Sequence, residues 1–139
     1  MLRAYARYIK QLRFGFSQPF MADVLVRNVA VAQQLVALFS SRFQPDMQDA
    51  EREHAIEESI LAALDAVSSL DDDKILRRFM VVIKATLRTN FYQQSEGQDK
   101  AYFSFKIDSQ SIPEIPEPKP KFEVFVYSPR IEGVHLRVG

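Results

Sequence analysis

The spacing of apolar residues changes once along this 139-residue chain, and that change limits the folds it can adopt. Up to about residue 92, apolar residues recur every three or four positions, the period of an α-helix with one buried face. After residue 100 they alternate, with Phe103, Phe105 and Ile107 on one side of an extended segment. The sequence therefore predicts an α+β fold in which helices come first and strands follow.

The first part predicts a helical bundle of four to five helices. Leu2, Tyr5 and Ile9 step along one face of a first helix. Ser17 suits the cap of a second helical segment, residues 20–43, which can break near Asn28. Further helices are predicted to begin near residues 47 and 71, and we expect the last one to run to about residue 92. Its predicted inward face consists of Ile75, Phe79, Val82, Ile83 and Thr86.

The second part predicts strands joined by a stiff connection. A strand is expected at residues 101–107 and another at 122–127, with strand-like alternation resuming at 134–138. Between them, residues 108–121 contain four of the seven prolines, so we expect an extended, proline-rich strap. These patterns predict two domains: a helical domain at 1–92 and a β segment at 93–139.

Charge and composition exclude several classes of function. The net charge is zero, but residues 1–45 carry six Lys or Arg against Asp23, and residues 46–73 carry ten Asp or Glu against Arg52. The simplest interpretation is that solvated helix faces pair with one another. The absence of cysteine excludes disulfides and thiolate metal sites. No apolar run reaches the length of a membrane span, so we expect a cytoplasmic protein with no membrane partner.

The sequence contains no recognisable cofactor or metal motif. Its four glycines are too far apart for a dinucleotide- or phosphate-binding loop, which needs them for tight turns, so no residue is predicted to bind a cofactor. Glu51 and His54 have the ExxH spacing of di-iron bundles, but a second copy is absent, so we predict no metal and an exposed His54.

Catalytic and nucleic-acid-binding patterns are equally sparse. No GxSxG motif supports a nucleophilic serine, so no catalytic residue is assigned. Arg77, Lys84 and Arg88 share a helical face that could contact phosphates. We favour instead the pairing of these residues with the acidic helix at 46–73, and we predict no nucleic-acid partner.

Several runs together resemble the large-subunit bacterial NAD-dependent glutamate dehydrogenases. The resemblance covers nearly the whole chain, and the terminal run FEVFVYSPRIEGVHLR is the most specific part of it. The other runs are LRAYARY at 2–8, FSQ at 16–18, LDDDKILRRF at 70–79, KATLRTNFYQ at 84–93 and FSFKI at 103–107. The sequence departs from many members at Val138, where they have a further glycine.

The resemblance implies that this chain is an internal fragment upstream of the catalytic core of a long enzyme, and that the β segment at 93–139 is the beginning of the substrate/catalytic domain of that parent. The parent would oxidise L-glutamate to 2-oxoglutarate and ammonia with reduction of NAD, and NAD would bind elsewhere in it. The implied partners are the rest of the parent chain and further copies in a homo-oligomer. If any side chain of this segment approaches the substrate, the candidates are Arg130, His135 and Arg137. Alternative functions are a stand-alone helical protein-interaction module and, less favoured, nucleic-acid binding through Arg77 and Arg88.

Overall fold

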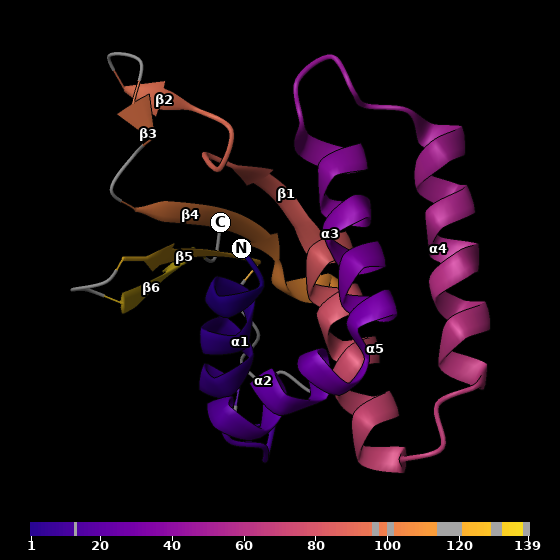
Figure 1. The fold of residues 1–139 in the computed structure, drawn as a ribbon. Helices are drawn as coiled ribbons and strands as arrows, with labels where there is room; N and C mark the ends of the chain where they lie inside the picture. Colours follow the sequence, from indigo (N-terminus) through magenta and orange to yellow (C-terminus); the bar gives the residue numbers. More distant parts are fainter. Residues whose placement is uncertain (13, 96–97, 100–101, 114–120, 129–131, 138–139) are drawn as a thin grey trace. The chain divides into compact units, whose positions relative to one another are not determined.

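A computed structural model describes residues 1–12, 14–95, 98–99, 102–113, 121–128 and 132–137 of the chain. The chain divides into two compact units, Met1–Ile83 and Lys84–Gly139. Five α-helices precede the strands (Figure 1). The predicted α+β order of helices followed by strands is therefore confirmed.

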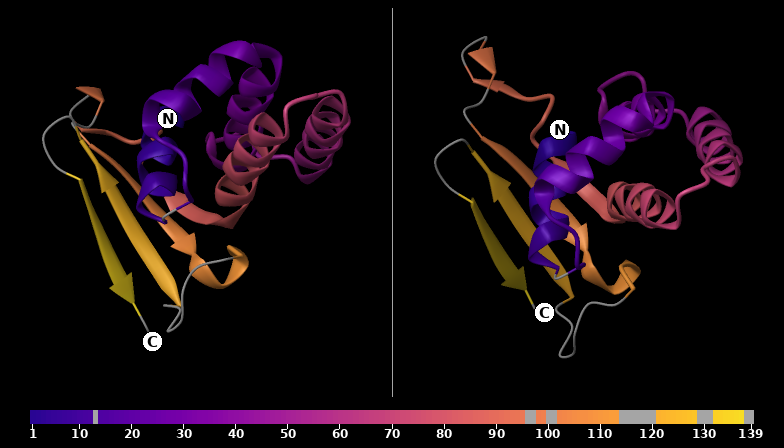
Figure 2. Two further views of the ribbon diagram at one scale, coloured as in Figure 1. Left: turned by 90° about the horizontal axis from the view of Figure 1, so that it is seen from below. Right: turned by 60° about the horizontal axis from the view of Figure 1, so that its bottom comes forward.

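The first unit is built from helices. They are α1 (Leu2–Gln11), α2 (Gln18–Arg27), α3 (Val29–Phe43), α4 (Ala50–Asp65) and α5 (Leu70–Ala85), the last of which extends just past the end of the unit. Helices α3 and α4 pack side by side and run in opposite directions, as both Figure 1 and Figure 2 show. The largest fully buried side chains of these helices include Tyr5, Tyr8, Met21, Leu35, Phe39, Ile60, Leu64 and Phe79.

Short polar side chains fix where the helices begin. The Ser17 hydroxyl accepts the Phe20 N–H at 3.2 Å, and Pro19 occupies the first turn of α2. Asp49 caps α4 by accepting two backbone N–H groups. The predicted break near Asn28 is present, since α2 and α3 meet there at an angle of 101°.

No single helix in the described part of the chain has the length and apolar character needed to cross a membrane. Helices α2 and α3 meet that requirement only when they are counted as one bent pair, and then by length and composition alone.

The second unit contains a four-stranded antiparallel sheet in the order β1-β4-β5-β6. Its strands are β1 (Thr86–Thr89), β4 (Phe103–Asp108), β5 (Phe122–Tyr127) and β6 (Glu132–Arg137). A 3-10 turn, η1 (Ser109–Ser111), follows β4, and a separate pair is formed by β2 (Gln94–Ser95) and β3 (Gln98–Asp99). Most of the predicted proline-rich strap, residues 114–120, lies outside the described residues.

The expectation that the last helix reaches about residue 92 is wrong. Helix α5 ends at Ala85, and the next residues form β1. In β1, Thr86 pairs with Ile107 and Thr89 with Phe105 of β4, with an irregularity between Thr86 and Arg88. A β-branched residue such as threonine suits a strand better than a helix, and cross-strand pairing outweighs the helical spacing here.

Candidate functional site

Two of the three residues predicted to lie closest to the substrate belong to β6, an edge strand of the sheet. His135 and Arg137 belong to β6, where their Cα atoms pair with those of Val124 and Phe122 in β5. Arg130 lies outside the described residues. The structure thus gives the strand register of His135 and Arg137, and their predicted proximity to a substrate stays a prediction.

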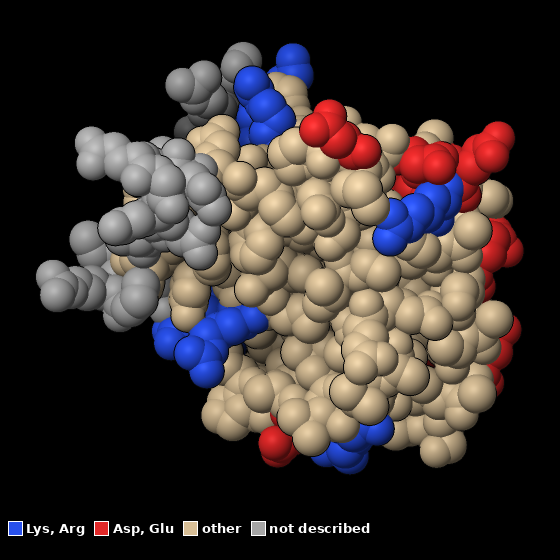
Figure 3. Space-filling view, turned by 45° about the horizontal axis from the view of Figure 1, so that its top comes forward, with Lys and Arg blue, Asp and Glu red and all other residues tan. Residues whose placement is uncertain are grey.

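Acidic and histidine side chains do not converge on a metal-like centre in the described residues. No group of three or more potential ligands is present among them. The His54 side chain is 73% exposed, and its Nε2 lies 3.7 Å from Glu58 Oε1 one turn further along α4. The prediction of an exposed His54 is confirmed. Figure 3 shows acidic side chains gathered along the edge of the molecule that α4 forms.

Part of the basic face predicted on α5 is engaged within the protein. The Arg77 Nε donates to both carboxylate oxygens of Asp73, at 3.0 and 2.9 Å, one helical turn earlier. The Arg78 guanidinium lies 4.6 Å from the centroid of the Phe14 ring. Arg77 therefore pairs with an acid, but Asp73 belongs to α5 itself, so this contact is not the predicted pairing with the acidic helix α4.

A partly buried polar network joins α5 to the corner between α2 and α3, and the sequence did not predict it. Arg27 Nη2 donates to Asp72 Oδ1 at 2.8 Å, and Asn28 Nδ2 donates to Asp72 Oδ2 at 3.0 Å. Asp72 is only 6% exposed. Hydrogen bonding from Arg27 is the largest influence on its carboxyl group, and together with the Asn28 amide it outweighs burial and lowers the Asp72 pKa below the ordinary value of 3.8. The network fixes the start of α5 against the α2–α3 corner.

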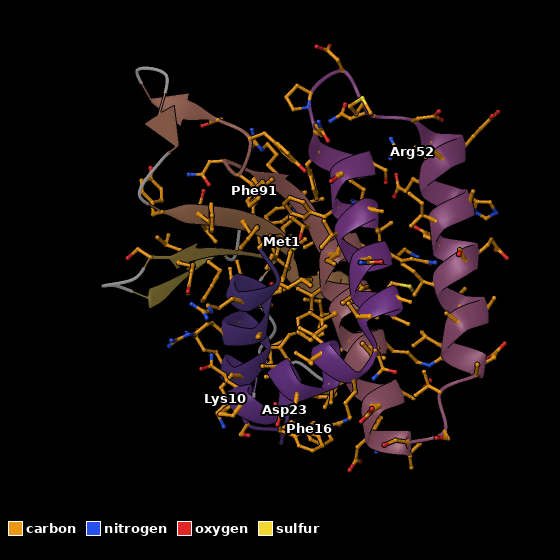
Figure 4. The ribbon with its side chains drawn as sticks, viewed as in Figure 1. Met1, Lys10, Phe16, Asp23, Arg52 and Phe91 are labelled. Carbon is orange, nitrogen blue, oxygen red and sulfur yellow. The ribbon has the colours of Figure 1, made fainter. Side chains whose placement is uncertain are left out.

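Aromatic rings extend this contact toward the turn between α1 and α2. Phe16 stacks on Phe20 with ring centroids 5.6 Å apart and lies 5.2 Å from Phe14. Arg27 lies 5.6 Å from the Phe20 centroid. Figure 4 shows Phe16 at the end of the first unit opposite Arg52 of α4. Arg27 thus contacts both the Phe20 ring and the Asp72 carboxylate, and these two contacts hold the helices together.

A pocket of about 490 Å³ lies beside this network, between the α2–α3 corner and the connection from α4 to α5. Its polar lining comes from Arg27, Asn28, Ser68, Ser69 and Asp72. The Arg27 Nε and Nη2 atoms and the Asn28 Nδ2 atom already donate to Asp72. The pocket lining contains no histidine or cysteine, and its one carboxylate, Asp72, already accepts hydrogen bonds from Arg27 and Asn28. We interpret the network as a structural clamp.

Two further polar contacts organise the sheet. The Asn90 side chain accepts the Ser104 N–H at 2.8 Å and donates to the Tyr102 carbonyl at 3.2 Å, which ties the end of β1 to β4. Buried Ser109 donates through its hydroxyl to buried Glu123 at 2.9 Å. Sequence analysis missed both because each partner lies 12 to 14 residues away.

Family models divide the chain into two matched segments. Residues 1–45 match a model described as glutamate dehydrogenase, helical motif 3. Residues 59–139 match a model described as bacterial NAD-glutamate dehydrogenase, catalytic domain. The second match begins within α4, so it includes helix α5 as well as the sheet.

Curated relatives agree with these matches. The chain is 52% identical to the NAD-specific glutamate dehydrogenases of Pseudomonas aeruginosa and Halomonas elongata, and 42% identical to that of Mycobacterium tuberculosis. Each alignment covers the whole of this chain but 9% of the relative. The chain therefore spans about one eleventh of the length of the proteins that it matches.

Proposed function

Because this chain belongs to the bacterial NAD-glutamate dehydrogenase family, we propose that it is a non-catalytic segment of such an enzyme. It supplies a helical unit and a sheet that support the parent protein. The observation that carries the proposal is a likeness that extends over all of this chain and over 9% of each relative. The parent reaction in this proposal is oxidative deamination of L-glutamate to 2-oxoglutarate and ammonia, with hydride transfer to NAD.

The lack of a nucleotide-binding motif in this segment favours a structural role for it. Gly15, Gly97, Gly133 and Gly139 are isolated from one another in the sequence. A dinucleotide site needs clustered glycines so that backbone N–H groups can approach the pyrophosphate. In this proposal NAD and the main glutamate-binding motif belong to other segments of the parent, which is cytoplasmic and homo-oligomeric.

A turnover assay tests the proposal. The purified chain, supplied with L-glutamate and NAD, should produce no NADH above a protein-free control, while the full-length dehydrogenase should produce it under the same conditions. Turnover by the purified chain that rises in proportion to its concentration would contradict a non-catalytic role.

The three candidate residues for proximity to the substrate provide a finer test. In the full-length enzyme we propose that at least one of Arg130, His135 and Arg137 lies near the substrate. Replacing each singly with alanine should then lower kcat/KM for glutamate in at least one variant, with the folding of the variant unchanged. Unchanged kinetics in all three variants would remove this part of the proposal.

The stand-alone interaction module is the second candidate, and the exposure of Val26 in the first unit favours it. An isolated chain that stays monomeric, and that does not bind the remainder of the dehydrogenase polypeptide, would support this candidate over the first. Nucleic-acid binding has less support, because Arg77 pairs with Asp73.

A further inference from the structure

A groove of about 600 Å³ runs between α1 and α2 within the first unit. We call it the α1–α2 groove, and its apolar lining comes from Leu2, Ala6, Pro19, Ala22, Leu25 and Val26. Val26 is 76% exposed, the highest value among the exposed large hydrophobic residues of the described chain. Apolar side chains gathered on a surface mark a place where another molecule or segment binds, because covering them removes apolar area from water.

The charged groups of the α1–α2 groove have one sign. Arg3 and Arg7 line it, and they lie one turn apart on α1. No carboxylate belongs to the lining, although Asp23 lies in α2 next to Ala22. Figure 4 labels Met1 and Lys10 near the two ends of α1, and Asp23 in α2. A segment that complements this surface carries apolar side chains for the floor and acidic side chains that face Arg3.

We propose that another segment of the same dehydrogenase polypeptide, outside residues 1–139, covers the α1–α2 groove with apolar and acidic side chains. This inference rests on the proposed function, because it requires the parent chain. The chain is 9% of the length of its relatives, so a parent of that length offers a large surface in the same molecule. A segment tethered in this way has an effective concentration in the millimolar range for a short linker, and so can bind through modest contacts.

A second copy of this chain fits the groove less well. The acids Glu51, Glu58 and Asp65 recur every seven residues along the exposed side of α4, and they match the charge of Arg3. Among the described residues of α4, Leu61 is the one exposed large hydrophobic side chain, at 37%. That face matches the charge of the groove but offers little to fill its apolar floor.

Cysteine labelling tests the proposed cover. The chain contains no cysteine, so Val26→Cys introduces a single thiol into it. The matched control is Ser59→Cys on the exposed side of α4. Both variants are made in the full-length dehydrogenase and in the isolated chain, and alkylation rates are measured at these positions by peptide mass spectrometry.

The proposal predicts different rates at the two positions. In the full-length enzyme, Val26→Cys should react at least about tenfold more slowly than in the isolated chain, which corresponds to about 1.4 kcal/mol in favour of the covered state. Ser59→Cys should react equally in both. Equal rates for Val26→Cys in both proteins, or equal protection at both positions, would overturn the proposal. Protection in the isolated chain that grows with its concentration would instead identify a second copy as the occupant.

A charge reversal tests the acidic part of the cover. In full-length Val26→Cys, adding Arg3→Glu should restore fast labelling, because it places a carboxylate against the acidic side chains of the covering segment. Adding Lys10→Glu should leave the rate unchanged, because Lys10 is exposed on α1 but does not line the groove. Equal effects of the two reversals would contradict the assigned acidic chemistry. None of these outcomes depends on whether the isolated chain reduces NAD, so the proposed function is tested separately.

Discussion

Replacing Asp72 with asparagine tests the clamp between α5 and the α2–α3 corner. The substitution keeps the shape of the side chain and removes its charge. The Asp72 side chain is 9% exposed, whereas the Arg27 side chain is 49% exposed and stays partly hydrated. Hydrogen bonds to charged groups contribute about 1.5–3 kcal/mol, and exposure of one partner reduces that value. We therefore expect Asp72→Asn to lower the free energy of unfolding by about 2 kcal/mol.

Urea denaturation followed by circular dichroism measures this loss, because the first unit contains nearly all of the helical residues. With a slope near 2 kcal/mol per molar, the midpoint should fall by about 1 M. The control is Asp71→Asn, which removes the same charge from the same helical turn at an exposed position. It should cost about 0.5 kcal/mol through the helix dipole alone. Equal losses in the two variants would refute the clamp.

The pH dependence follows from the lowered pKa of Asp72. A carboxyl group whose pKa is lower in the folded state stabilises the fold above its unfolded pKa, near the ordinary value of 3.8. That stabilisation is lost as the pH falls through the lower, folded pKa. The stability difference between the wild type and Asp72→Asn should therefore be full at neutral pH and should shrink below about pH 4. A difference that persists unchanged in acid would show that charge is not its source.

Two further substitutions test the packing of each unit. Leu35→Ala in α3 should lower the free energy of unfolding by about 3 kcal/mol in urea denaturation, because Leu35 is fully buried. The control is Val36→Ala, because the neighbouring Val36 is 43% exposed, and it should lower the free energy of unfolding by less than about 1 kcal/mol. Similar losses of stability in the two variants would contradict the assigned core. In the second unit, Asn90→Ala leaves the Ser104 N–H without its side-chain acceptor and should cost about 2 kcal/mol by tyrosine fluorescence. The control is Gln93→Ala, because Gln93 is exposed. If the Asn90→Ala variant is as stable as this control, Asn90 does not tie the end of β1 to β4.

Periodicity was sufficient to predict the helices where one face of each is buried along its length. Tyr5 and Ile9 of α1 are buried as their spacing predicts. The end of α5 was not predictable in the same way. The spacing of Val82, Ile83 and Thr86 fits one helical face whether the helix ends at Ala85 or continues to residue 92. The pairing of Thr86 with Ile107, some twenty residues further along, decides the outcome. Long-range pairing of this kind leaves no local signal.

The partners of Asp72 in the clamp were also not predictable from local sequence. Asp72 was predicted in the first turn of a helix, where an acid is favourable without any tertiary partner. Helical spacing places Asp72 on the same face as Ile75 and Phe79, whereas Asp71 is exposed and Asp73 pairs with Arg77 in its own helix. Arg27 lies 45 residues away and Asn28 lies 44 away. The spacing therefore predicts that Asp72 faces inward, but only the tertiary fold determines its partners.

Titration of NADH into the isolated chain, followed by calorimetry, tests most directly the claim that this segment supports the enzyme without binding its cofactor. The full-length dehydrogenase serves as the positive control and should give saturable heat. The isolated chain should give only heat of dilution over the same range. Saturable binding of NADH to the isolated chain would contradict the account.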